Sequence, residues 1–216
     1  MPGMHCRVPA VLLAATLALP AWGQELGQWH AGLSFSYSLP VSSLGKWFLP
    51  APNLDIAIGQ RITEQWTVAG GVELARYDRE ALSGYAAGKL TLLLEHVAAL
   101  VVGEFQLTDH GQVFPFLLLS GGVYRWKGVR GAVPADSSVT PYLPAIAERR
   151  LCATNWGMRL GFGLKTRAWH RLALEGRVWY RLVLGDLWPT MQPHIELEGV
   201  SGFQTMNASV GVRYFF

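Results

Sequence analysis

Residues 207–216 read NASVGVRYFF, and this closing stretch decides the fold. Its side chains divide by position into an apolar set and a set that is small or polar apart from Phe215 and carries one cation, Arg213. The apolar set, traced back to residue 206, is Phe216, Tyr214, Val212, Val210, Ala208 and Met206. A period of two indicates a β-strand, because successive side chains of a strand point to opposite faces. Two explanations fit: an edge strand of a soluble sandwich, or a strand with lipid on one side and a lumen on the other.

The composition favours a membrane or exported protein. Charged residues make up 15% of the 216 residues, whereas soluble domains carry roughly 25%. Hydrophobic residues reach 50%, and the chain has 9 Trp and 24 Gly. All-β barrels of this length usually form one unit, so we expect one domain.

The first residues predict a signal peptide, residues 1–23, followed by a single domain, residues 24–216. They combine one arginine, an apolar stretch and the small-x-small triplet Ala21–Gly23, as secretory signals do. The apolar stretch is shorter than the roughly 18 residues of a spanning helix. Cys6 would leave with the signal, so Cys152 would have no disulfide partner in the mature chain. The role of Cys152 stays open.

Neither nucleic-acid binding nor a membrane helix is expected. The net charge is +3, or 3 − 1 = +2 after loss of Arg7 with the signal, and no Lys/Arg run accompanies it. The most apolar later segment, KLTLLLEHVAALVVGEFQL, is interrupted by Glu95, His96 and Glu104. An exported, apolar chain of this kind is a soluble periplasmic barrel or a barrel in the outer membrane.

Alternation recurs along the mature sequence and predicts eight strands. The clear apolar sets are Leu33–Leu39, Leu54–Ile58, Trp66–Leu74, Trp156–Leu164, Leu172–Leu182 and the closing set, each taken at every second residue. Two middle strands are less regular. Over 95–107 we expect Val97, Ala99, Val101 and Phe105 outside, with Glu104 and Gln106 inside. Over 113–126 both parities are partly apolar, and we expect Phe114, Phe116, Leu118, Tyr124 and Trp126 outside.

The connections alternate in length. Short links are expected near 63–65, 108–112 and 167–170, and long ones at about 40–53, 77–93, 127–153 and 184–203. An even number of strands with short turns on one rim and long loops on the other is typical of an all-β, eight-stranded antiparallel up-and-down transmembrane barrel. Both termini would then lie on the short-turn, periplasmic side.

The period alone does not say which face is outside. A soluble lipocalin-like barrel has the same alternation with apolar side chains inside, and it would carry solvating Lys, Glu and Thr outside. Here the polar parity is rich in Gly, Ser and Ala, as expected for a narrow lumen. The apolar parity has aromatic residues near strand ends, where interfacial girdles fall: Trp66, Trp156, Tyr180, Tyr214 and Phe216. These features favour lipid outside.

The closing strand resembles the C-terminal signature of bacterial outer-membrane barrels. The signature consists of Phe216 preceded by apolar residues at alternating positions: Val210, Val212 and Tyr214, with Ala208 before them. The eight-strand rhythm over about 29–216 is similar to small OmpA/OmpX-like barrels, and FPFLLLSGGVY looks like their Pro-aromatic, Gly-rich strand. The resemblance implies a monomer integral to the outer membrane of a Gram-negative bacterium. It also implies contact with outer-membrane lipid and lipopolysaccharide, and an assembly signal read by the barrel-assembly machinery: Val210, Val212, Tyr214 and Phe216.

Charged residues on the polar parity form a candidate lumen network. They are Asp55, Arg61, Glu73, Glu104, Arg159, Lys165, Glu175, Arg177, Arg181 and Arg213. Charges in a narrow lumen must pair or stay wet, because an unpaired buried ion is costly. We interpret the set as an ion-pair network that plugs the barrel. A narrow, porin-like pore through the charged lumen is the alternative.

Evidence for catalysis or cofactor binding is weak. The last long loop holds Asp186, His194, Glu196, Glu198 and Ser201, which are the residue types of a lipid acyl hydrolase or transferase. Nothing shows that they converge, so we favour a solvated loop and no enzyme. No zinc-type spacing supports a metal site, and no cofactor is expected.

The longest loop carries a basic cluster: Lys127, Arg130, Arg149 and Arg150. It could bind lipopolysaccharide phosphates or simply solvate the loop, and we favour solvation. The function predicted from the sequence is thus an integral outer-membrane barrel with a structural or loop-mediated interaction role. The proposed register predicts that Val210→Arg is costly and that Ser209→Arg is better tolerated.

Overall fold

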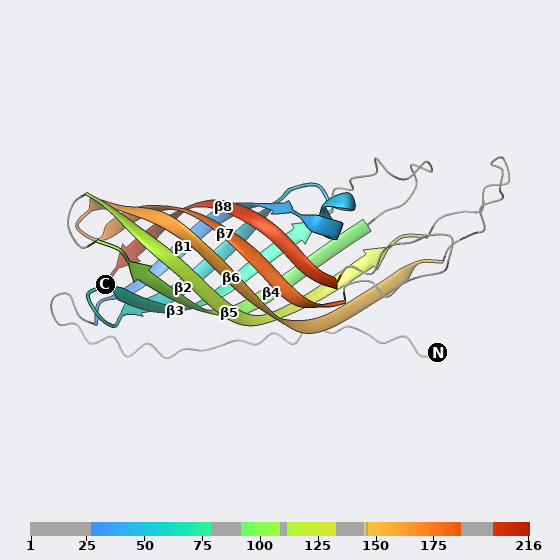
Figure 1. Cartoon of the computed structure of the whole chain (residues 1–216), viewed down its shortest axis with the longest axis horizontal. Coiled ribbons are helices and arrows are strands. Elements are labelled where there is room, and N and C mark those ends of the chain that lie inside the picture. The colour runs from blue at the N-terminus through green and yellow to red at the C-terminus, as the bar shows by residue number, and fades with distance from the viewer. Residues whose placement is uncertain (1–26, 79–91, 109–111, 133–144, 146, 187–200) are drawn as a thin grey trace.

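A computed structural model describes residues 27–78, 92–108, 112–132, 145, 147–186 and 201–216, apart from the side chains of 43, 46, 186 and 201. The predicted signal peptide lies outside the described residues. The chain forms one closed antiparallel barrel, in which each strand pairs with the next (Figure 1). A short 3-10 helix, η1 (Ser42–Lys46), follows the first strand. The strands are β1 (Trp29–Pro40), β2 (Ala51–Arg61), β3 (Trp66–Tyr77), β4 (Leu92–Gln106), β5 (Val113–Arg130), β6 (Arg149–Trp169), β7 (Leu172–Asp186) and β8 (Ser201–Phe215).

The closing strand β8 joins both ends of the sheet. It pairs with β7 on one side and with β1 on the other, where the register runs from His30↔Phe215 to Pro40↔Thr205. The described strands therefore close into a tube, although residues 149–156 of β6 pair with β5 alone. In the described part of the chain, no helix is long and apolar enough to cross a membrane.

The outer surface of the barrel is apolar. Outward-facing side chains from every strand are largely exposed, among them Phe35 at 61%, Leu160 at 63% and Val210 at 71%. The charged side chains of the strand interiors instead point into the lumen and are buried. This is the opposite of a lipocalin-like barrel and matches the exterior of a transmembrane barrel.

The parity expected for β5 is wrong. Phe116, Leu118, Tyr124 and Trp126 point into the barrel and are 1–5% exposed, whereas the neighbouring Leu117 is 47% exposed. The lumen accepts these large side chains because β6 supplies glycines opposite them. A Cβ atom on Gly163 would lie 2.4 Å from the Phe116 ring, and one on Gly157 would lie 2.6 Å from the Tyr124 ring.

The β5–β6 hairpin is longer than the sequence pattern predicted. Strand pairing continues to Arg130↔Arg149, so the link spans 131–148 and not 127–153. The expected basic cluster of the longest loop therefore lies on strand ends. Strand β6 also runs to Trp169, which shortens the expected 167–170 link. Figure 1 shows this hairpin extending to the end of the barrel that lies opposite the C-terminus.

Candidate functional site

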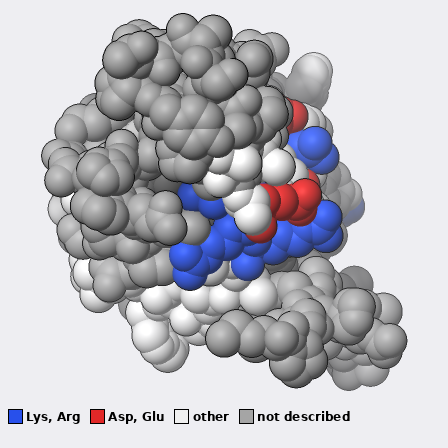
Figure 2. All heavy atoms as spheres, turned by 90° about the vertical axis from the view of Figure 1, so that its right-hand side faces the viewer, with Lys and Arg blue, Asp and Glu red and all other residues white. Residues whose placement is uncertain are grey.

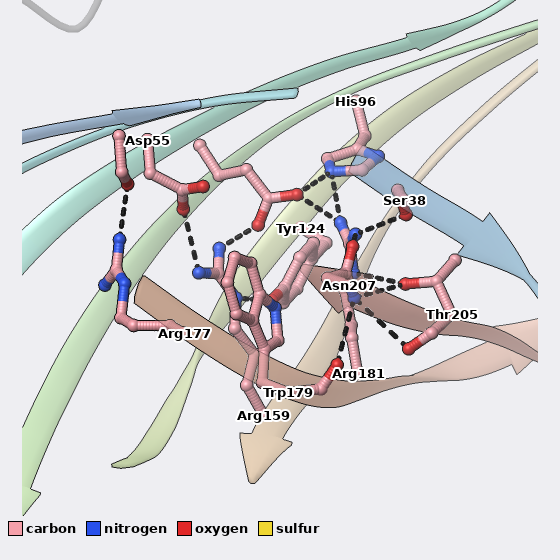
Figure 3. Close-up of polar contacts among 12 residues, drawn as sticks. Ser38, Asp55, His96, Tyr124, Arg159, Arg177, Trp179, Arg181, Thr205 and Asn207 are labelled. Carbon is pink, nitrogen blue, oxygen red and sulfur yellow. Dashed lines mark hydrogen bonds and ion pairs between the residues drawn. The ribbon is translucent and has the colours of Figure 1, made fainter. Parts of the chain in front are cut away.

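Glu73 on β3 is the centre of the polar contacts inside the lumen. It is fully buried and accepts hydrogen bonds from the guanidinium groups of Arg159 and Arg181. Its Oε1 atom also lies 2.8 Å from Nε2 of His96. One carboxylate thus ties β3 to β4, β6 and β7 across the lumen (Figure 3).

The two arginines extend this contact to other strands. Arg159 donates to Oδ1 of Asp55 at 2.8 Å and to the Tyr124 hydroxyl at 3.1 Å, and its guanidinium lies 5.7 Å from the centre of the Trp179 ring. The Arg159 guanidinium is therefore held both by charge-assisted hydrogen bonds and against a ring. Arg181 is fully buried. Besides Glu73 it donates to three further oxygens: Oγ1 of Thr205 at 3.0 Å, Oδ1 of Asn207 at 2.7 Å and Oγ of Ser38 at 3.1 Å.

A second charge cluster lies nearer the short turns. Arg213 on β8 binds Glu104 through two hydrogen bonds of 2.7 and 2.6 Å and binds Glu175 at 2.6 Å. The Lys165 ammonium lies 3.8 Å from Glu104, and the Arg177 guanidinium lies 3.5 Å from Glu175 and donates to Ser34. The bidentate Arg213–Glu104 geometry fixes both side chains.

Arg61 does not join either cluster. It is the last residue of β2, and its guanidinium donates to the carbonyl oxygens of Thr63, at 3.2 Å, and Glu64. These carbonyls belong to the turn that follows β2, so the Arg61 side chain holds this turn at the rim of the barrel and does not enter the lumen network. The other predicted charges of the network lie inside the lumen: Asp55, Glu73, Glu104, Arg159, Lys165, Glu175, Arg177, Arg181 and Arg213.

The neutral hydrogen-bond partners of the charged side chains were not predicted from the sequence. His96, Tyr124, Thr205, Asn207 and Ser38 complete the hydrogen bonds of the Glu73 cluster. Their inward parity was the available signal for most of them. His96 was read as an interruption of an apolar segment, and Tyr124 was placed outside.

An apolar, mostly aromatic layer fills the loop half of the lumen. The Tyr77 ring centre lies 5.5 Å from that of Phe203, and His96 lies 5.3 Å from Phe203 at the boundary with the charges. Phe48, which follows η1, packs on Tyr77 at 6.2 Å. Fully or nearly fully buried neighbours complete the layer: Leu44, Leu92, Leu94, Trp126 and Val183. Side chains therefore occupy both halves of the interior, as in other narrow barrels.

The outer face at the loop end changes from apolar to charged. Arg76 follows Leu74 on the outward parity of β3, pairs with Asp78 at 3.2 Å and lies 3.4 Å from Glu95. Lys127 stands opposite Glu95 in the β4–β5 register. Arg125 lies two residues before Lys127 on β5, opposite Val97. Arg150 on β6, opposite Val129, lies closer to the loop end and pairs with Glu148 at 2.5 Å. Figure 2 shows cationic side chains gathered at this end, with acidic side chains among them.

The structure does not test the loop residues considered for catalysis. His194, Glu196 and Glu198 lie outside the described residues, and only the backbones of Asp186 and Ser201 are described, as a cross-strand pair. Within the described residues, no three His, Cys, Asp or Glu side chains form a group that could hold a metal ion.

Comparison with known proteins places the fold. No family model and no curated protein matches the chain. Among solved structures, Neisserial surface protein A matches with a TM-score of 0.51 and 15% identity over 87% of this chain and 97% of its own. Ail of Yersinia pestis, in complex with the heparin analogue sucrose octasulfate, matches with a TM-score of 0.52 and 11% identity over 89% and 100%. OprG of Pseudomonas aeruginosa matches with a TM-score of 0.52 and 12% identity over 90% and 98%.

The closed eight-strand register, the apolar exterior and these structural matches agree. The chain has the fold of the small eight-stranded outer-membrane β-barrels. At identities of 11–15% the likeness concerns the fold, and the role has to be argued from this chain's own residues.

Proposed function

We propose that this chain is a monomeric, integral outer-membrane barrel that acts through the outer face of its loop end and not through its lumen. The observation that carries the proposal is the filled interior: a buried ion-pair network lies in one half and an apolar layer in the other. A pore would require the Glu73 cluster and the rings above it to move aside together. Both chain termini would lie on the periplasmic side.

The ligand class we propose for the loop end is the phosphate groups of lipopolysaccharide. The cations concerned are Arg125, Lys127 and Arg150, which belong to the loop-end parts of β5 and β6. Guanidinium groups bind phosphate well because they present paired donors. Ail, a barrel of the same fold, was solved in complex with the heparin analogue sucrose octasulfate, which supports an anionic partner.

The closing strand supports the proposal that β8 carries the assembly signal. Val210, Val212, Tyr214 and Phe216 are 41–71% exposed on the outer face. A partner protein could therefore contact these side chains before lipid covers them. Tyr214 and Phe216 also pack on each other, with ring centres 5.5 Å apart.

Binding to lipopolysaccharide tests the loop-end proposal. We expect the refolded mature protein to bind vesicles that contain lipopolysaccharide more tightly than vesicles of zwitterionic phospholipid alone. The triple variant R125Q/K127Q/R150Q should lose about tenfold in affinity, because each phosphate contact near a surface contributes on the order of 1 kcal/mol or less. Co-sedimentation at low and high salt measures the effect.

A matched control uses the opposite rim. The double variant R167Q/R171Q removes cations near the short turn between β6 and β7 and should leave lipopolysaccharide binding unchanged. Equal losses in both variants would mean that net charge alone drives binding, and the loop-end proposal would then fail.

Planar-bilayer recording tests the claim about the lumen. We expect inserted wild-type protein, checked for folding by its heat-dependent gel mobility, to show no discrete conductance steps. The reason is that the interior is occupied by paired charges and packed rings. Discrete steps that change on replacement of Arg177 would favour the pore and contradict the proposal.

A further inference from the structure

Strand β6 runs beyond its neighbour β7 at the loop end of the barrel. Its pairing with β5 begins at Arg149, whereas its pairing with β7 begins only at Gly157↔Val183. Figure 1 shows β6 continuing past the end of β7, at the end of the barrel opposite the C-terminus. Within the part of the chain that the structure describes, no strand therefore pairs with the β7-facing edge of β6 over residues 149–156.

The point at which β7 leaves β6 has a local cause. Gly185 follows shortly after the last β6–β7 pair and has a φ of 147°, which residues with a side chain rarely adopt. A Cβ atom at Gly185 would lie 2.0 Å from Nδ2 of Asn155. The Asn155 side chain is itself held by the Trp126 indole, which donates to its Oδ1 at 2.8 Å. The two strands therefore separate at Asn155, and residues 149–154 lie beyond this fork.

The edge formed by residues 149–154 is regular and held in place. The β5–β6 register continues through it without a shift, and the segment contains no proline. Leu151 and Ala153 pack against the buried apolar cluster of the barrel. Natural edge strands are usually blocked by a bulge, a proline or charges, and here the only charges are Arg149 and Arg150 at one end. Such an edge can pair with a further extended strand through its backbone groups.

The two faces of this edge differ in chemistry. The inward parity carries the apolar residues Leu151 and Ala153, and the outward parity carries Arg150, with Lys127 of β5 opposite Cys152. An added strand would therefore be complementary with apolar side chains on its inner face and acidic side chains on its outer face. The described residues 123–130 and 147–156 hold five cations and one acid: Arg125, Lys127, Arg130, Arg149, Arg150 and Glu148.

We propose that residues 149–154 of β6 bind an extended, alternating acidic and apolar segment of another protein by strand addition. A second copy in the same membrane does not fit, because both β6 strands would run in the same direction. Pairing in register would then place Arg149 and Arg150 opposite the same arginines of the second copy, and like charges directly opposite are destabilising. The proposal does not depend on lipopolysaccharide binding.

A short labelled peptide of alternating glutamate and valine tests strand addition. We expect it to bind the protein in nanodiscs of zwitterionic phospholipid about tenfold more tightly than a peptide of alternating glutamate and proline. The two peptides carry the same charge, but proline has no backbone donor for the pairing. Fluorescence anisotropy measures both affinities.

Variants of the protein locate the site. R149Q/R150Q should weaken binding of the glutamate–valine peptide by about fivefold, because two charge contacts near a surface are lost. R167Q/R171Q, near the short turn between β6 and β7, should leave it unchanged.

Equal affinity for the two peptides would mean that charge alone attracts them and would overturn the proposal. Equal losses in the two arginine variants, or no binding of the glutamate–valine peptide, would also overturn it. So would binding that appears only after residues 187–200 are replaced by a short glycine–serine link, since the chain would then cover its own edge.

Discussion

Replacement of Glu73 by alanine should destabilise the barrel by about 3–5 kcal/mol, the usual cost of removing one partner from a buried ion pair. The variant leaves the guanidinium groups of Arg159 and Arg181 without their shared carboxylate, and both side chains are at most 4% exposed. Reversible urea unfolding in phospholipid vesicles measures the change.

The matched control is Glu95→Ala. Glu95 carries the same charge and pairs with Arg76 at 3.4 Å, but the two side chains are 38% and 62% exposed. An exposed pair contributes less than about 1 kcal/mol. Similar costs for the two variants would show that water penetrates to the Glu73 cluster, and the interpretation of a filled lumen would have to be abandoned.

Replacement of Val210 by arginine should cost about 2–4 kcal/mol, the penalty for a cation on the lipid face near the bilayer midplane. Val210 is 71% exposed on the outer face of β8, between β1 and β7. The substituted guanidinium would face hydrocarbon with no acidic neighbour on the same face of the paired positions, Phe35 and Gly176. Unfolding in vesicles again gives the magnitude.

The control for Val210 has to differ from the one expected from the sequence alone. Ser209 is 8% exposed and stands opposite Arg177 in the register, so Ser209→Arg would add a cation to a crowded, cationic part of the lumen. A better control is Gln204→Arg, on the same face of β8 but closer to the loop end. Its cost should be about 0–1 kcal/mol, as near an interface. Equal costs at 204 and 210 would contradict the assigned depth.

The alternation of apolar and polar side chains predicted the outward and inward faces of most strands. It did so because most strands place apolar side chains toward lipid and small or polar side chains toward the lumen. It failed for β5, where both faces are apolar: Leu117 and Leu119 meet the exterior, and Phe116 and Tyr124 fill the interior. A polar-inside rule assumes a lumen that is polar throughout. The large apolar side chains inside this barrel break that assumption, and only Ser120 marks the inward parity of the middle of β5.

The sequence predicted which charges lie inside but not which of them pair. Arg159 and Asp55 are 104 residues apart and meet only because strand tilt and register bring β6 and β2 together across the lumen. The hydrogen bonds of Arg61 to the turn carbonyls and the contact of His96 with Glu73 likewise depend on how the strands are placed in the closed barrel. The β5–β6 hairpin is longer than the sequence predicts. Charged residues such as Lys127 and Arg150 are typical of a loop, but in the structure they continue the backbone pairing of β5 with β6.

The cross-lumen contacts of Glu73 also bear on how the barrel folds. This side chain bonds residues 86 and 108 positions away, on strands that are not its hydrogen-bonded neighbours. Such contacts gain energy only after β8 has met β1, since the walls face each other only in the closed tube. Folding should therefore be slow, as expected for contacts of high sequence separation. Unfolding should be cooperative. Opening the β1–β8 seam separates the walls of the barrel, so the contacts that Glu73 on β3 makes with β6 and β7 are lost together.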